Sequence, residues 1–188
     1  MYKLCHTEES SQRQRSLEAG LLIAMGKQPY DKITLTDLCR QLDVPRKSFY
    51  RYFPTKDDCL LGLIDHTLAD CNAAALTDWE GDKELKQVHL LRFFSYWKQQ
   101  ETFLYAVRDN GFDHLLLERT TVIVDTMKEK AHSVSFAKDQ VEYFIAHGLM
   151  VTVLRWHRFG FQSSPGEMAR TFAELLHSPE VSITKLML

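Results

Sequence analysis

Apolar side chains recur every three or four residues along nearly the whole chain, and this spacing constrains the fold more than any other feature. Only eight glycines and five prolines punctuate the 188 residues. Strict alternation of apolar and polar residues, which would indicate half-buried strands, is scarce. Because a period near 3.6 residues places apolar side chains on one face of a helix, the sequence predicts an all-α protein of about nine helices.

Capping residues and helix breakers predict where these helices begin and end. Thr34 suits an N-cap, and the run from Ser164 to Glu167 forms a capping box with Pro165 at the first helical position. We expect one helix to start at residue 45, and the others to cover about 8–25, 34–42, 56–76, 83–99, 101–109, 113–131, 139–159 and 165–176.

Residues 44–53, with the sequence VPRKSFYRYF, combine four aromatic side chains with three bases and no acid. On a helical wheel Phe49 and Phe53 fall on one side, whereas Lys47 and Arg51 fall opposite. The composition therefore separates by face. We predict that the two phenylalanines anchor this helix to the domain and that the bases point outward.

The helix over 34–42, a turn at Asp43 and the helix from Pro45 together form a helix-turn-helix pattern. Aspartate tolerates the left-handed backbone that such a turn requires. The 17 residues from Arg40 to Lys56 contain five bases and one acid, although the whole chain has a net charge of -2. A local basic patch indicates an anionic partner, and an outward basic helix fits the DNA major groove. The alternative is a small helical unit with a solvated basic face; the turn, the facial separation and the tyrosines favour DNA.

The pattern from Ile33 to Cys39, followed by Val44 and the run from Phe49 to Asp57, resembles the DNA-binding signature of the TetR family of transcriptional regulators. The resemblance implies a helix-turn-helix DNA-binding domain over residues 1–55 and a ligand-binding and dimerisation domain over 56–188. It also implies homodimers on palindromic, double-stranded operator DNA. The resulting DNA-contact candidates are Thr34, Thr36, Arg46, Lys47, Ser48, Tyr50, Tyr52 and Lys56, and the wheel position adds Arg51.

The turn and the start of the third helix depart from the family pattern. Asp43 stands where glycine is usual, Pro45 replaces a serine cap, and Lys47-Ser48 replaces a common Gly-Thr. Since the departures fall where a recognition helix meets base edges, we expect the operator preference of this protein to depend on them.

The C-terminal half resembles the family more weakly. The pattern from Phe144 to Ala169 is similar to the last two helices of regulators of dihydroxyacetone kinase operons. By that resemblance the last two helices form the homodimer interface, and Gly148 would allow two helices to approach closely. An ordinary monomer core is the alternative interpretation of the same apolar residues.

Aromatic residues concentrated in the second half of the chain suit the walls of a pocket for a small hydrophobic effector. Plain core packing explains each of them as well. The candidate ligand-binding residues are Phe93, Tyr96, Trp97, Phe103, Tyr105 and His147.

Several classes of protein are disfavoured. The four cysteines have no metal-ligand spacing, so we expect reduced thiols and no metal or cofactor. The polar N-terminus and the short apolar runs predict a cytoplasmic protein without a membrane partner. No nucleotide-binding, serine-hydrolase or metalloprotease motif is present, so we expect no enzyme. An activator or an adaptor that acts through a protein partner without a small-molecule ligand remains the alternative to an effector-controlled regulator.

Overall fold

The computed structural model describes residues 2, 5, 7–75, 87–129 and 136–177. These residues form nine α-helices and no strand, which confirms the predicted fold class. The helices are α1 (Glu8–Met25), α2 (Leu35–Gln41), α3 (Arg46–Phe49), α4 (Lys56–Ala75), α5 (Gln87–Gln99), α6 (Glu101–Asp109), α7 (Asp113–Glu129), α8 (Phe136–Arg158) and α9 (Pro165–His177), with a 3-10 turn, η1 (Tyr30–Lys32), between α1 and α2.

The capping signals at Thr34 and at Ser164 predicted the starts of their helices correctly. Thr34 caps α2, because its Oγ1 accepts a hydrogen bond from the Asp37 amide at 3.1 Å. At the start of α9, Ser164 and Glu167 exchange the two reciprocal bonds of a capping box, at 2.7 and 3.2 Å.

Three details of the boundaries differ from the prediction. The helix α3 is only four residues long, with Pro45 as its N-cap rather than its first residue. The turn η1 was not predicted, and α8 begins at Phe136 rather than near residue 139. The expected helix start at 83 and the expected ends at 76 and 131 lie outside the described residues.

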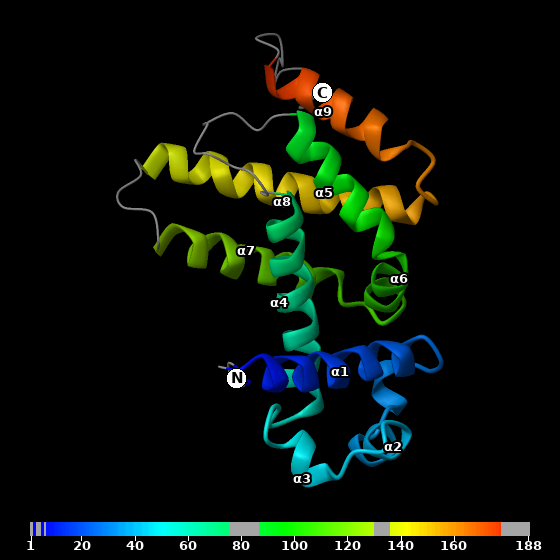
Figure 1. The fold of residues 1–188 in the computed structure, drawn as a ribbon. Helices are drawn as coiled ribbons and strands as arrows, with labels where there is room; N and C mark the ends of the chain where they lie inside the picture. The colour runs from blue at the N-terminus through cyan, green and yellow to red at the C-terminus, as the bar shows by residue number, and fades with distance from the viewer. Residues whose placement is uncertain (1, 3–4, 6, 76–86, 130–135, 178–188) are drawn as a thin grey trace.

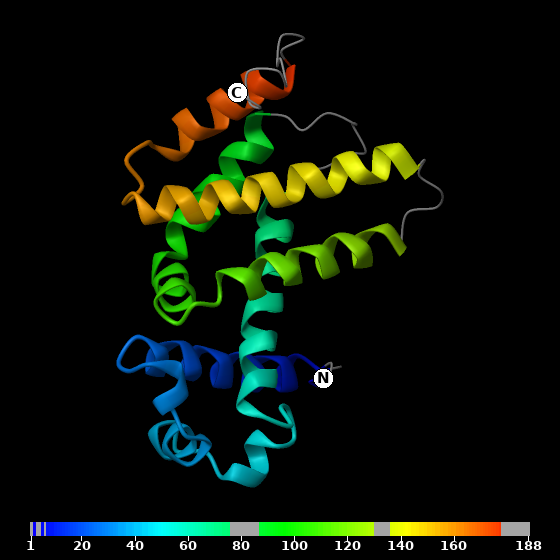
Figure 2. The same ribbon diagram turned by 180° about the vertical axis from the view of Figure 1, so that it is seen from behind.

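The helices divide into a small group at one end of the molecule and a larger bundle at the other (Figure 1). The first three helices form the small group, and α4 runs from it into the bundle. There α4 contacts α5 and α7, while α9 packs on α5 and α8 packs on α7. Figure 2 shows α8 crossing the opposite face of the bundle with no other element in front of it. Among the described helices, none is long and apolar enough to cross a membrane.

Two aromatic clusters lie in the cores of these groups. In the small group Phe49 and Phe53 are fully buried, with ring centroids 5.6 Å apart. In the bundle Phe94 and Trp97 are fully buried among other aromatic rings. Burial of one such side chain contributes about 1.5–3 kcal/mol, so each cluster stabilises the group that contains it.

Candidate DNA-binding surface

The turn between α2 and α3 is held by two backbone hydrogen bonds. Asp43 has a φ of 51° and its amide donates to the Arg40 carbonyl at 3.2 Å. The next amide, of Val44, donates back to the Cys39 carbonyl at 2.9 Å. This is a Schellman arrangement, in which the left-handed residue usually is glycine. The predicted left-handed role of Asp43 is therefore confirmed.

The residues that follow the turn are named here the recognition segment, residues 46–53. Its helical part ends at Phe49, but the Phe53 amide still donates to the Phe49 carbonyl at 3.1 Å. Both phenylalanines therefore reach the core, as the helical wheel predicted. Gly62 on α4 makes room for the second ring, since a Cβ there would come within 2.8 Å of the Phe53 Cε1 atom.

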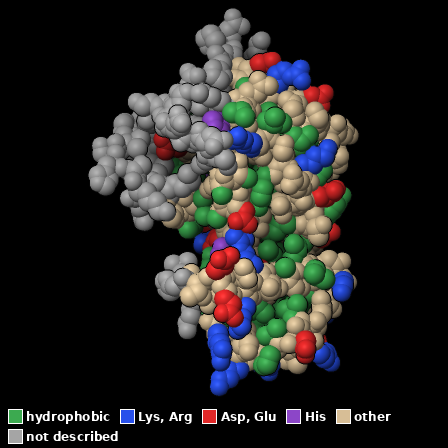
Figure 3. All heavy atoms as spheres, in the orientation of Figure 1, with side chains coloured by type: hydrophobic (Ala, Val, Ile, Leu, Met, Phe, Trp, Pro, Cys, Tyr) green, Lys and Arg blue, Asp and Glu red, His purple; other side chains and the backbone are tan. Residues whose placement is uncertain are grey.

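Arg46, Lys47, Tyr50 and Arg51 are exposed on the recognition segment. The Arg46 guanidinium donates to the Tyr50 hydroxyl at 3.1 Å and lies 5.9 Å from the centre of its ring. This hydrogen bond raises the pKa of Arg46, which stays cationic. Figure 3 shows lysine and arginine side chains gathered at the end of the molecule that carries α2 and α3. An exposed cationic face on a fixed backbone is suited to contact with nucleic acid.

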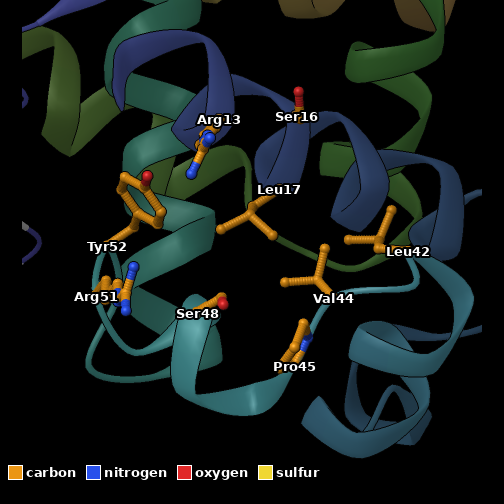
Figure 4. Close-up of a pocket in the computed structure, with 9 residues that line it drawn as sticks. All are labelled: Arg13, Ser16, Leu17, Leu42, Val44, Pro45, Ser48, Arg51 and Tyr52. Carbon is orange, nitrogen blue, oxygen red and sulfur yellow. The ribbon is translucent and has the colours of Figure 1, made fainter. Parts of the chain in front are cut away.

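Ser48 and Tyr52 lie on the flank of the recognition segment that faces α1, and both are half-buried. Together with Arg51 they border a groove whose other wall includes Arg13 and Leu17 of α1 (Figure 4). Arg13 was not among the predicted contacts. Its place beside the recognition segment depends on how α1 packs, and no local motif signals that.

Thr34 and Lys56 already have partners within the protein. The Thr34 hydroxyl caps α2 and donates to the Asp37 carboxylate at 2.6 Å, whereas Thr36 is exposed. The Lys56 ammonium donates to the carbonyls of Tyr30 and Ile33, both at 2.8 Å. Lys56 therefore holds the segment that leads into α2, and one of its three N–H groups remains for another acceptor.

Tyr30 connects the small group to the bundle. Its backbone amide donates to the Asn110 side-chain oxygen at 2.6 Å, and its ring meets Phe112 edge-on at 5.0 Å. Its hydroxyl donates to Asp57 at 2.5 Å. Burial and this bond to a carboxylate raise the pKa of Tyr30, so the hydroxyl remains a donor. Sequence reasoning missed this junction, because its partners lie up to 80 residues apart.

A partly buried ion pair forms a second junction. Asp65 of α4 accepts hydrogen bonds from Arg119 of α7 at 2.6 and 2.7 Å and from the Tyr2 hydroxyl at 2.8 Å. Nearby, Glu18 of α1 is 1% exposed and its carboxylate lies 2.8 Å from the His66 Nδ1 atom of α4. These contacts fix α1, α4 and α7 against one another, so the recognition segment stands on a braced support.

The candidate ligand-binding residues fall into separate places. Trp97 has ring contacts with Phe93, Tyr96 and Phe103, at centroid distances between 5.6 and 6.4 Å. Tyr105 packs instead on His157, at 4.4 Å. His147 also stands apart from the Trp97 cluster, because its Nε2 atom lies 3.0 Å from the Thr121 hydroxyl and so links α8 to α7.

The outer face of α8 carries a stripe of apolar residues. Val141, Phe144 and Val151 of α8, and Phe159 directly after its last residue, are exposed by 50% or more. They recur at the spacing of one helical face, and Gly148 lies between them with open space where a Cβ would stand. An exposed apolar stripe of this length is typical of an interface.

The cysteine side chains lie mainly in the core. Cys39, Cys59 and Cys71 are buried free thiols and Cys5 is half-buried. Within the described part of the chain, no group of three or more histidine, cysteine, aspartate or glutamate side chains is placed to hold a metal ion.

A fixed left-handed turn, a recognition segment anchored by two phenylalanines and an exposed basic face define a helix-turn-helix DNA-binding protein. Residues 22–63 match the family model described as bacterial regulatory proteins, tetR family. This match identifies a TetR-type DNA-binding domain over residues 22–63. No curated protein sequence matches the chain.

The fold as a whole has a similar solved structure. The protein described as "Dihydroxyacetone kinase operon activator DhaS" matches with a TM-score of 0.57 and 18% identity, over 87% of this chain and 93% of that chain. At this identity the match shows a shared fold, and it extends through both groups of helices.

Proposed function

We propose that the chain is a cytoplasmic, homodimeric transcription regulator that binds palindromic operator DNA through α2 and the recognition segment, and that a small hydrophobic effector releases or activates it. The observation that carries the proposal is the exposed set of Arg46, Lys47, Tyr50 and Arg51 on a segment anchored by fully buried rings. Guanidinium and ammonium groups recognise guanine in the major groove, whereas hydroxyl groups and further cations hold phosphates and so set the register.

The roles of the nine candidate contacts follow from their surroundings. Arg46, Lys47 and Arg51 are the base-reading candidates, because they are exposed on the recognition segment. The others are phosphate or register contacts, with Lys56 and Thr34 also holding the backbone in front of α2. The phosphate or register contacts are Thr34, Thr36, Ser48, Tyr50, Tyr52 and Lys56.

The apolar stripe on α8 supports a dimer. Phe144 is 78% exposed in the single chain, and a second copy related by two-fold symmetry would cover it. An interface formed by α8 and α9 would present two recognition segments on one side of the dimer. Two-fold related segments about 34 Å apart would meet successive major grooves of a palindromic operator.

The aromatic cluster around Trp97 supports the effector part of the proposal. An apolar ligand that enters beside Phe93, Tyr96 or Phe103 would displace rings that pack against Trp97. Tryptophan fluorescence would report such binding. Quenching with unchanged DNA affinity would show that a ligand binds there without controlling the protein.

DNA binding is tested with the DNA upstream of the protein's own gene and with selection from random sequences. We expect affinity that falls steeply as salt rises, since phosphate contacts release counterions. Lys47→Ala should lower the affinity and change the selected sequence, whereas Tyr52→Phe should lower the affinity with the same selected sequence. Lys27→Ala, an exposed base away from the recognition segment, is the matched control. Absence of affinity for either DNA at about 50 mM salt refutes the proposal.

A further inference from the structure

The groove between α1 and the recognition segment has the size of a small-molecule site. Its volume is about 330 Å³, and sites for organic ligands commonly measure about 300–1,000 Å³. Figure 4 shows that its two ends differ. Arg13, Arg51 and Tyr52 lie at one end, and Leu42, Val44 and Pro45 lie at the other.

The first end is cationic. Arg51 is exposed, and within the described residues its guanidinium group makes no ion pair or hydrogen bond. Arg13 pairs with Glu9 at 2.5 Å, but the two side chains are 62% and 75% exposed, so the pair contributes little and can exchange. The residues that line the groove include no carboxylate. Two guanidinium groups with no acid between them suit an anionic group, which arginine binds with two parallel hydrogen bonds.

The second end is apolar and fixed in shape. Leu42 packs so closely on α1 that a Cβ on Gly20 would come within 2.3 Å of its side chain. Leu17 is 4% exposed and forms part of the floor. Val44 follows the left-handed turn and is held by its bond to the Cys39 carbonyl. A DNA phosphate would satisfy the arginines, but it would leave this apolar end uncovered.

We propose that the groove binds an amphipathic organic anion. Its carboxylate, sulfonate or phosphate group accepts hydrogen bonds from Arg13 and Arg51, and its hydrocarbon part covers Leu42, Val44 and Pro45. This ligand differs from an effector held among the aromatic rings of the bundle, because it lies within the DNA-binding half.

The position of the groove gives the ligand a direct effect on DNA binding, a step that rests on the proposed function. Ser48, Arg51 and Tyr52 are DNA-contact candidates, and the same side chains border the groove. A ligand seated there occupies the groove-facing flank of the recognition segment. The anion and operator DNA therefore compete for one surface, and no movement between the two halves of the protein is required.

The site is tested with two fluorescent probes that share their aromatic rings. Anilinonaphthalenesulfonate carries a negative charge, whereas phenylnaphthylamine lacks it. The full-length protein is titrated with each probe in the absence of DNA. Arg13→Gln removes one of the two guanidinium charges from the groove, and Ser16→Phe places a bulky ring on its α1 wall. Arg15→Gln is the matched control, because Arg15 lies on the same helix but pairs with Asp70 at 2.8 Å.

We expect Arg13→Gln to weaken binding of the sulfonate about tenfold, as loss of one charge-assisted hydrogen bond predicts, and to leave the neutral probe unaffected. Ser16→Phe should weaken the binding of both probes, whereas Arg15→Gln should change the binding of neither probe. Equal sulfonate binding by wild type and Arg13→Gln overturns the proposal, as does loss of operator affinity in Arg13→Gln without any change in sulfonate binding.

Competition is measured separately, with labelled promoter DNA. The sulfonate should displace DNA from wild type at a midpoint concentration that follows the affinity of the sulfonate for the protein. With Arg13→Gln, displacement should require about tenfold more sulfonate. Displacement that is equal in the two proteins overturns the competitive site. If the protein binds the sulfonate as expected but binds no DNA at all, the regulator proposal fails and the anion site stands.

Discussion

Replacement of Gly62 by alanine tests whether close packing or helix propensity controls the support of the recognition segment. Gly62 lies inside α4, where alanine is favoured over glycine by about 1 kcal/mol. Against this, the new Cβ would come within 2.8 Å of the Phe53 Cε1 atom and 2.9 Å of the Glu18 Oε1 atom. Both side chains are buried, at 0% and 1% exposure, so neither can turn into solvent.

The steric cost should exceed the gain. Overpacking of a well-filled core costs about 1–3 kcal/mol, and displacement of the Glu18 carboxylate also weakens its contact with the His66 ring at 2.8 Å. We therefore expect Gly62→Ala to lower the free energy of unfolding by about 1–2 kcal/mol. For a chain of this size the melting temperature should fall by about 2–8 °C.

Urea and thermal unfolding, followed by circular dichroism, measure the effect. Phe53→Leu removes one of the two obstacles, so the double variant Gly62→Ala with Phe53→Leu should be more stable than the sum of the single effects predicts. DNA affinity should fall in Gly62→Ala, because Phe53 anchors the recognition segment. A Gly62→Ala protein as stable as wild type, or more stable, would refute the packing argument.

Three further variants or conditions test other parts of the structure. Asp65→Asn should destabilise the fold by about 2–3 kcal/mol in urea unfolding, because it leaves the Arg119 charge unpaired; a loss below about 0.5 kcal/mol would contradict the brace between α4 and α7. Burial raises the pKa of the Cys71 thiol to about 12, so alkylation of this thiol at pH 8 should be slow until the chain unfolds. The free energy of unfolding should fall above about pH 9, because only the thiol of the unfolded chain ionises there. Fast alkylation of Cys71 in the native protein would contradict the raised pKa. Gly148→Ala should add about 1 kcal/mol to the stability of the monomer yet weaken the dimer, as sedimentation would show; an unchanged dimer places the interface elsewhere.

Signals contained within a few residues predicted much of this fold. The capping box at Ser164 and Glu167 and the cap at Thr34 both form as their spacing indicates. The separation of Phe49 from the bases also followed from the wheel. Each of these depends on contacts between neighbours in the chain, which a sequence shows directly.

Periodicity alone could not predict where α3 ends. The spacing of Phe49 and Phe53 fits a continuing helix, yet only residues 46–49 are helical and turns follow. The Phe53 amide still bonds to the Phe49 carbonyl, so both rings point inward either way. A repeat of four residues reports which side chains share a face, but it does not distinguish a regular helix from successive turns with the same handedness.

The contacts that position the surface were hidden because they join distant residues. Lys56 reaches carbonyls 23 and 26 positions away, and Asp65 meets a guanidinium 54 positions away. The sequence shows a lysine that suits a phosphate, but it does not show that two carbonyls already hold it. Arg13 lies beside the recognition segment for the same reason, through the packing of α1.

A helix as short as α3 cannot maintain itself, since isolated helices below about 12 residues are marginal in water. The direction of Arg46 and Lys47 therefore depends on tertiary anchors. Phe49 and Phe53 fix the segment from inside, the turn at Asp43 fixes its start, and Gly62 sets how deeply its end can sink against α4. The chemistry that meets DNA lies in exposed bases, but its geometry is set by buried residues, so core variants and surface variants should both change operator binding.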